Sequence, residues 1–195
     1  MDPEEPIDPV DRIALPPRFH SEETGEPFES CIECSLPLGA TGDGYIIQKC
    51  TNGRETIFEF ALCMTCGESL HESYSEKSRR AIEGFFQDHI DIEKRYDDTW
   101  LLDLPELADH FLQHCLTCGD APKPGDPVTH AAVCEGSEML VGHSPICLCS
   151  KCEAALNELV SKETRDEWDK FIGRNFDLPP SDALNPDTGK PVLVL

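Results

Sequence analysis

The sequence predicts an α+β protein that consists of two small units in tandem, and three observations support this fold class. Two cysteines separated by two residues occur four times in the 195-residue chain. The first and third of these pairs precede alternating apolar residues around a glycine, which is typical of a β-hairpin. The second and fourth pairs precede apolar residues at helical spacing. The same order of elements therefore occurs twice, and we interpret it as an internal duplication.

The cysteine pairs form two sets of four. The first set is Cys31, Cys34, Cys63 and Cys66, and the second set is Cys115, Cys118, Cys149 and Cys152. Four thiolates surround one Zn²⁺ as a tetrahedron in structural zinc sites. We therefore expect two zinc ions per chain, each bound by one set. Eleven cysteines in a chain without an export signal favour metal binding over disulfides, although redox-active or disulfide-bonded cysteines are the alternative.

The similarity between the copies continues beyond the cysteine pairs. At an offset of 84 residues, Cys50 matches Cys134, and at an offset of 86, Ser78-Arg79 matches Thr164-Arg165. Each copy spans about 60 residues, a length at which a metal commonly supplies the stability that a small core lacks.

The duplication divides the chain into five segments. These are an acidic, proline-rich arm (1–28) that we expect to be extended, a first zinc unit (29–92), a linker with a short helix (93–111), a second zinc unit (112–173) and a proline-rich C-terminal tail (174–195). The apolar residues of the two ends could anchor a partner or pack on their own chain; they are Ile13, Leu15 and Phe19 in the arm and 192–195 in the tail.

Each copy begins with a predicted hairpin. In the first copy, strands at 45–47 and 57–60 are joined at Asn52-Gly53. In the second copy, strands at 128–134 and 139–141 flank Glu135-Gly136.

Helical spacing then runs from Leu70 to Ile90 and from Leu156 to Ile172, and Gly173 is expected to end the second helix. In the linker, 105–112 reads as a short helix with Pro105 near its start.

Two known arrangements could use such cysteine pairs. In a zinc ribbon, both pairs lie on hairpin turns and strands follow each. Here a helix follows the second pair directly, and this order resembles treble-clef zinc fingers, in which a zinc knuckle, a β-hairpin and the first turn of a helix surround the metal. The resemblance covers 31–90 and 115–173. It implies two tandem treble-clef-like units with a linking helix.

Four sulfur ligands leave no open coordination position, so the sites are expected to be structural rather than catalytic. His114 and His143 lie near the second set but have no counterpart in the first, so we expect them to be exposed or to lie beside the metal rather than to bind it. Nuclease members of the treble-clef group carry a histidine-led motif, which this sequence does not contain. A phosphate-binding loop and a nucleophile elbow are also missing from the sequence, which thus supports no enzyme class.

Three cysteines fall outside the two sets. Cys50 and Cys134 occupy matching positions and are expected to be small buried residues, with a reactive pair or alternate ligands as the other possibility. Cys147 is the spare thiol of the second set, because the repeat aligns Cys149 and Cys152.

The formal net charge is −22, and every segment is acidic. Such a surface repels phosphate backbones, so we expect no binding to duplex DNA. It favours simple solubility, with a basic protein partner or mimicry of nucleic acid as the alternatives. The sequence has no apolar stretch of membrane-spanning length and no export signal, which predicts a cytoplasmic protein.

The leading hypothesis is a non-catalytic zinc-binding protein that acts as an acidic protein–protein interaction module or adaptor. One alternative is a transcription-associated factor that binds a polymerase or another basic protein. Another is a thiol redox or zinc sensor that uses Cys50, Cys134 and Cys147.

Overall fold

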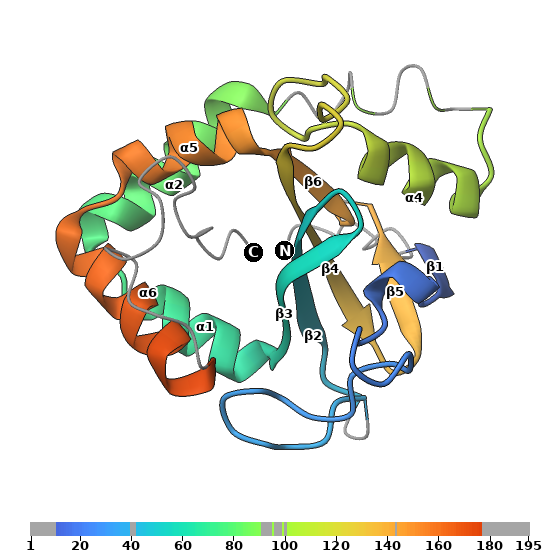
Figure 1. Cartoon of the computed structure of the whole chain (residues 1–195), viewed down its shortest axis with the longest axis horizontal. Coiled ribbons are helices and arrows are strands. Elements are labelled where there is room, and N and C mark those ends of the chain that lie inside the picture. Colours follow the sequence, from blue (N-terminus) through green and yellow to red (C-terminus); the bar gives the residue numbers. More distant parts are fainter. Residues whose placement is uncertain are drawn as a thin grey trace, which may run out of the picture.

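The computed structural model describes residues 11–39, 42–90, 95, 99, 101–142 and 144–176, and it has a mixed α/β fold (Figure 1). Its elements in chain order are β1 (Asp11–Ala14), the 3₁₀ helix η1 (Pro17–Phe19), β2 (Tyr45–Asn52), β3 (Glu55–Cys63), α1 (Met64–Glu72), α2 (Glu76–His89), α4 (Leu104–Gln113), β4 (Pro127–Glu135), β5 (Glu138–Val141), β6 (Ile146–Cys149), α5 (Ser150–Leu159) and α6 (Lys162–Asn175). In this part of the chain, every helix is too short or too polar to cross a membrane.

One antiparallel sheet contains the strands of both copies. The strand order is β1-β5-β4-β2-β3, and β6 also pairs with β4. The central pair, β2 with β4, joins one strand from each copy along eight residue pairs, from Tyr45–Cys134 to Asn52–Pro127. Both expected hairpins form, and Gly53 and Gly136 adopt positive φ angles in their turns.

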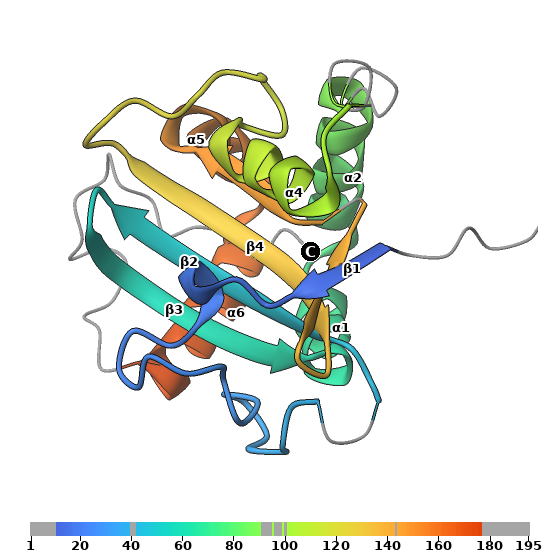
Figure 2. The same ribbon diagram turned by 90° about the vertical axis from the view of Figure 1, so that its right-hand side faces the viewer.

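The sheet separates two apolar cores. Helices α1, α2, α5 and α6 cover one face, while α4 and the arm lie toward the other (Figures 1 and 2). Alternate residues of a strand point to opposite faces, and the two cores follow this alternation. Phe58, Phe60 and Leu62 pack with Trp168 and Phe171 under the helices. The core on the opposite face contains Tyr45, Ile47, Ala132, Leu15, Phe19 and Phe111.

The described part of the arm packs against the fold. Strand β1 pairs with β5 from Asp11–Val141 to Ala14–Glu138. Leu15 and Phe19 are buried. Two of the arm's three anchor candidates thus lie in the chain's own core and the third, Ile13, packs against it, whereas the C-terminal residues 192–195 lie outside the described residues.

Each apolar stretch after a second cysteine pair forms two helices rather than one. The break occurs at Ser75 and Ser161, whose hydroxyls accept the backbone N–H of Ser78 and Thr164 and thereby cap α2 and α6. The expected stop at Gly173 is wrong, because α6 continues to Asn175. Gly173 lacks the positive φ angle of a glycine helix cap. The linker helix forms as α4, with a capping box between Asp103 and Glu106.

An approximate two-fold relation connects the two copies. Val128 in the second copy corresponds to Tyr45 in the first. Tyr45 pairs with Cys63, which directly precedes α1, and Val128 pairs with Cys149, which directly precedes α5. The β2–β4 ladder contains the pair Tyr45–Cys134 and also its two-fold image, Thr51–Val128. The same surface of each copy therefore contacts the other, as in the interface of a symmetric dimer.

The first turns of α2 and α6 also contact each other symmetrically, on the face of the sheet that α1, α2, α5 and α6 cover. Ser75, Ser78, Ser161 and Thr164 form what we name the hydroxyl cluster, with 2.9 Å between the Oγ atoms of Ser75 and Ser161. The backbone N–H of Ser75 donates to Thr164 Oγ1 (3.1 Å), and the N–H of Ser161 donates to Ser78 Oγ (2.8 Å). Each cap thus receives a hydrogen bond acceptor from the other copy.

Candidate metal centres

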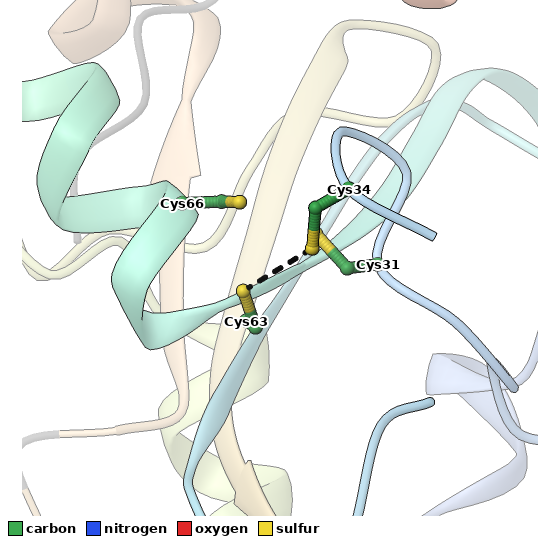
Figure 3. A group of neighbouring side chains, drawn as sticks. All are labelled: Cys31, Cys34, Cys63 and Cys66. Carbon is green, nitrogen blue, oxygen red and sulfur yellow. Dashed lines mark hydrogen bonds between the residues drawn. The ribbon is translucent and has the colours of Figure 1, made fainter. Parts of the chain in front are cut away.

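The first cysteine group joins a turn, a strand end and a helix start (Figure 3). Cys31 and Cys34 lie on the turn before the first hairpin, Cys63 ends β3, and Cys66 lies in the first turn of α1. Their four sulfur atoms lie within 4.8 Å of one another and point toward a common centre. The Sγ atoms of Cys34 and Cys63 are 3.8 Å apart.

The second group repeats this construction. Cys115 and Cys118 lie on the turn after α4, Cys149 ends β6, and Cys152 lies in the first turn of α5. All four sulfur atoms again lie within 4.8 Å of one another, with 3.9 Å between the Sγ atoms of Cys118 and Cys149. The structure therefore brings together each expected set of four.

The sulfur separations fit a tetrahedral metal site. With metal–sulfur bonds of about 2.3 Å, as in zinc sites, a tetrahedron has sulfur–sulfur edges of about 3.8 Å. A disulfide needs about 2.05 Å between its sulfur atoms. All eleven cysteines are free thiols in the structure. Each group could therefore hold one metal ion, and its donors are the soft thiolates that zinc accepts.

Identical backbone turns present the first two ligands of each group. Ser35 N–H donates to Cys31 O and Gly119 N–H donates to Cys115 O, both at 2.8 Å. The residue after each pair has a positive φ angle, 60° at Ser35 and 73° at Gly119. Glycine adopts this conformation freely, whereas in serine it costs conformational free energy.

Backbone N–H groups favour a thiolate at the first cysteine of each group. Burial alone raises the pKa of Cys115, but N–H groups, including that of Cys149 at 3.4 Å, and the Thr117 hydroxyl at 3.3 Å lower it to about 6. Burial likewise opposes ionisation of Cys31, and the N–H groups of Cys34 and Cys63 bring its pKa below the ordinary value.

The helix-borne thiols behave differently. Burial raises the pKa of Cys66 and of Cys152, and neighbouring thiols of the same group add to the increase. Four thiolates at such short separations repel one another, and a divalent cation at their centre removes this repulsion. The donor set thus fits a cation.

Each metal group also contacts the second helix of the other copy. Glu33, between Cys31 and Cys34, accepts hydrogen bonds from Arg174 (2.8 Å) and Asn175 (2.7 Å) at the end of α6. In the second group, Phe86 of α2 packs against the apolar cluster that Cys115 and Cys152 form with Leu148. The groups therefore connect the two copies as well as the elements within each copy.

The three remaining cysteines are buried and lie outside both groups. Burial raises the pKa of Cys50, Cys134 and Cys147 to about 12 in each case. The expectation that Cys50 and Cys134 occupy equivalent places is wrong. Cys50 packs under the helices and Cys134 packs on the opposite face of the sheet. The strand pairing aligns the two copies one residue differently from the cysteine repeat, so the counterpart of Cys50 is Val133 rather than Cys134.

Among the described residues, no histidine joins either group. His114 lies next to Cys115 in sequence, but its Nδ1 contacts His110 O at 2.9 Å. His143 lies outside the described residues.

The fold and the two groups define the class of protein. It is a mixed α/β protein with one antiparallel sheet and two tetracysteine groups that could each hold a metal ion. The chain matches no protein-family model, no curated protein and no solved structure.

Proposed function

We propose that this chain binds two Zn²⁺ ions in structural sites and serves as a non-catalytic, acidic protein–protein interaction module. The observation that carries the proposal is the pair of four-sulfur groups, each with all its sulfur atoms within 4.8 Å. Zinc bound by four thiolates has no open position for water or substrate, so its role is to stabilise the fold. Each ion would link a turn, a strand end and a helix start, in the manner of a treble-clef unit.

The charge of the chain supports a basic partner. A formal charge of −22 on 195 residues accelerates the encounter with a basic protein and repels nucleic acid. The high pKa values and burial of Cys50, Cys134 and Cys147 leave these thiols almost wholly protonated and therefore poorly reactive, so the interaction role is favoured over a thiol sensor.

Metal analysis tests the zinc sites. Purified protein should contain about two equivalents of zinc, and chelation should unfold it, because metal binding and folding are coupled in small metalloproteins. A folded preparation that lacks metal and contains disulfides would contradict the proposal.

Binding experiments test the partner class. The zinc-loaded protein should not shift duplex DNA in a gel near 0.15 M salt, and it should bind a basic protein with an association rate that falls as salt rises. Affinity purification with mass spectrometry then identifies the partner and separates a general adaptor from a transcription-associated factor. Tight binding to duplex DNA contradicts the electrostatic argument.

A further inference from the structure

The outer edge of β3 carries backbone groups that are available for strand pairing. β3 is the last strand of the sheet on its side (Figure 2). Ala61 O accepts the N–H of Ile32 at 2.9 Å, which identifies Ala61 as an outward-facing residue. Because this orientation alternates along an antiparallel strand, the N–H and C=O of Glu59 also face outward. In the described part of the chain, no backbone group pairs with this edge from Thr56 to Glu59, although Glu22 of the arm binds the side chains of Thr56 and Glu59.

A groove follows this open edge. It is a shallow, open groove of roughly 440 Å³ and is lined by Glu22, Glu23, Thr56, Ile57, Phe58, Glu59 and Phe176. Residues 56–59 of β3 line it, and the β2–β3 register is irregular at Ile57, which has no partner in β2. The side chains of Phe58 and Glu59 belong to opposite faces of the sheet. The groove therefore occupies the position that the next strand of the sheet would take. Ile57, which lines it, is 46% exposed despite its apolar side chain.

The two walls of the groove differ in chemistry. On the side of the helices, Phe58 and Phe176 form an apolar wall, with ring centroids 6.2 Å apart in an edge-to-face arrangement. On the side of the arm lie the carboxylates of Glu22, Glu23 and Glu59, and none of the described lysines or arginines lines the groove. Glu59 is already bound by Lys49 at 2.7 Å and by the N–H of Glu22 at 2.7 Å, so Glu22 and Glu23 provide the charge that a ligand meets.

We propose that the edge of β3 binds an extended basic segment of a partner protein, which adds a strand to the sheet. Backbone hydrogen bonds to Glu59 give the segment its register. Successive side chains of a strand point to opposite sides, so lysine or arginine residues meet Glu22 and Glu23 while the alternating apolar residues contact Phe58 and Phe176. The open edge of four residues extends over about 13 Å and takes a short segment.

This inference rests on the proposed interaction function and gives that function a site and a ligand. A second copy of the chain is a poorer occupant, because it brings another −22 charges to the same acidic edge. An anionic ligand meets the same repulsion. The arrangement therefore favours a basic peptide.

The test uses the zinc-loaded full chain and a fluorescein-labelled octapeptide of alternating lysine and valine. Fluorescence anisotropy should show binding at about 0.05 M salt that weakens at about 0.3 M salt. Glu23→Lys should reduce the affinity about tenfold, because a like charge replaces an attractive one. The matched control, Asp109→Lys on α4, changes the charge equally on a helix that packs against β1 and β6 and should leave the affinity within about twofold.

Two further probes test the strand pairing itself. The same peptide with methylated backbone nitrogens on one edge cannot donate those hydrogen bonds and should bind at least tenfold more weakly. Equal affinity for the methylated peptide, or equal losses in Glu23→Lys and Asp109→Lys, overturns the edge site while leaving the interaction function intact. Failure of every basic peptide and basic protein to bind the zinc-loaded chain overturns both.

Discussion

At the scale of single residues, the two cysteine turns differ in one instructive position. Both turns require a positive φ angle directly after the second cysteine, and the second copy has Gly119 there while the first has Ser35. Ser35 is the only residue other than glycine with a positive φ angle in the described part of the chain. A side chain in this conformation costs about 1 to 2 kcal/mol, so the first turn is the more strained.

Exchanging these residues should move stability in opposite directions. Ser35→Gly should raise the free energy of unfolding of the zinc-loaded protein by about 1 kcal/mol, and Gly119→Ser should lower it by a similar amount. Urea denaturation followed by circular dichroism measures both. Gly84→Ser on α2 is the control, because a Cβ at Gly84 meets nothing within 4 Å and its φ angle is not positive. A loss as large at Gly84 as at Gly119 would mean that the turn conformation is not the cause.

The ligands and the spare cysteines should respond very differently to substitution. Cys63→Ser or Cys149→Ser removes one of four donors and should cause loss of zinc and of folded structure. Cys50→Ser and Cys147→Ser leave all four donors in place and should keep about two zinc equivalents, with a modest loss of stability from a buried hydroxyl. Zinc content and circular dichroism distinguish the cases. Equal zinc loss in Cys147→Ser and Cys149→Ser would identify Cys147 as a ligand.

The spacing of the cysteines was sufficient to predict which residues meet at each centre, because two close pairs with similar intervals occur twice. The partners around the centres could not be predicted in the same way. Glu33 binds Arg174 across most of the chain, and only the folded arrangement brings them together. The prediction that Cys50 and Cys134 are equivalent was wrong. A one-residue shift in strand pairing moves a side chain to the other face of the sheet, and the spacing of the cysteines does not reveal such a shift.

At the scale of secondary structure, the hydroxyl cluster sets where the helices begin. The apolar spacing alone suggested one helix after each cysteine group, because it continues through the break. The signal for two helices was nevertheless present in the sequence as Ser75 and Ser161, which precede Ser78 and Thr164 by three residues in matching positions of the repeat. What the sequence could not indicate is that the two caps meet and exchange hydrogen bonds.

Substitutions in this cluster should therefore be coupled. Ser78→Ala and Thr164→Ala each remove an acceptor for a backbone N–H of the other copy and should each cost about 1 to 2 kcal/mol. The double variant should lose less than the sum by at least about 0.5 kcal/mol, because the two hydroxyls belong to one hydrogen-bonded network. Chemical denaturation of the zinc-loaded single and double variants measures their free energies of unfolding, which together form a double-mutant cycle.

Ser69→Ala on an exposed position of α1 serves as the control for the cycle, and its effect should stay within about 0.5 kcal/mol. Strict additivity of Ser78→Ala and Thr164→Ala would show that the two caps act independently.

At the scale of the whole molecule, the two copies form one structure rather than two independent units. The β2–β4 ladder joins them through the sheet, the hydroxyl cluster joins them through the helix starts, and each metal group contacts the second helix of the other copy. The sequence indicated the duplication, but it gave no information on this exchange. Strand and helix partners between copies depend on long-range contacts that local periodicity does not record.

This arrangement predicts that the two metal sites are energetically coupled. Loss of the ion from the first group should loosen Cys31 and Cys34, and with them the contact of Glu33 with the end of α6. Helix α6 shares the hydroxyl cluster with α2, and α2 supplies Phe86 to the second group. Loss of order at one site should therefore weaken metal binding at the other, because both sites depend on the same helices and the same sheet.

Two measurements test the coupling. Cys63→Ser, which lacks a ligand of the first group only, should retain clearly less than one zinc equivalent in a zinc buffer that keeps the unaltered protein fully loaded. Calorimetry of the unaltered, zinc-loaded chain should show a single cooperative transition, because the strands of both copies belong to one sheet. If Cys63→Ser keeps one full equivalent and the unaltered protein unfolds in two separate transitions, the copies are independent, and the contacts between them contribute little free energy.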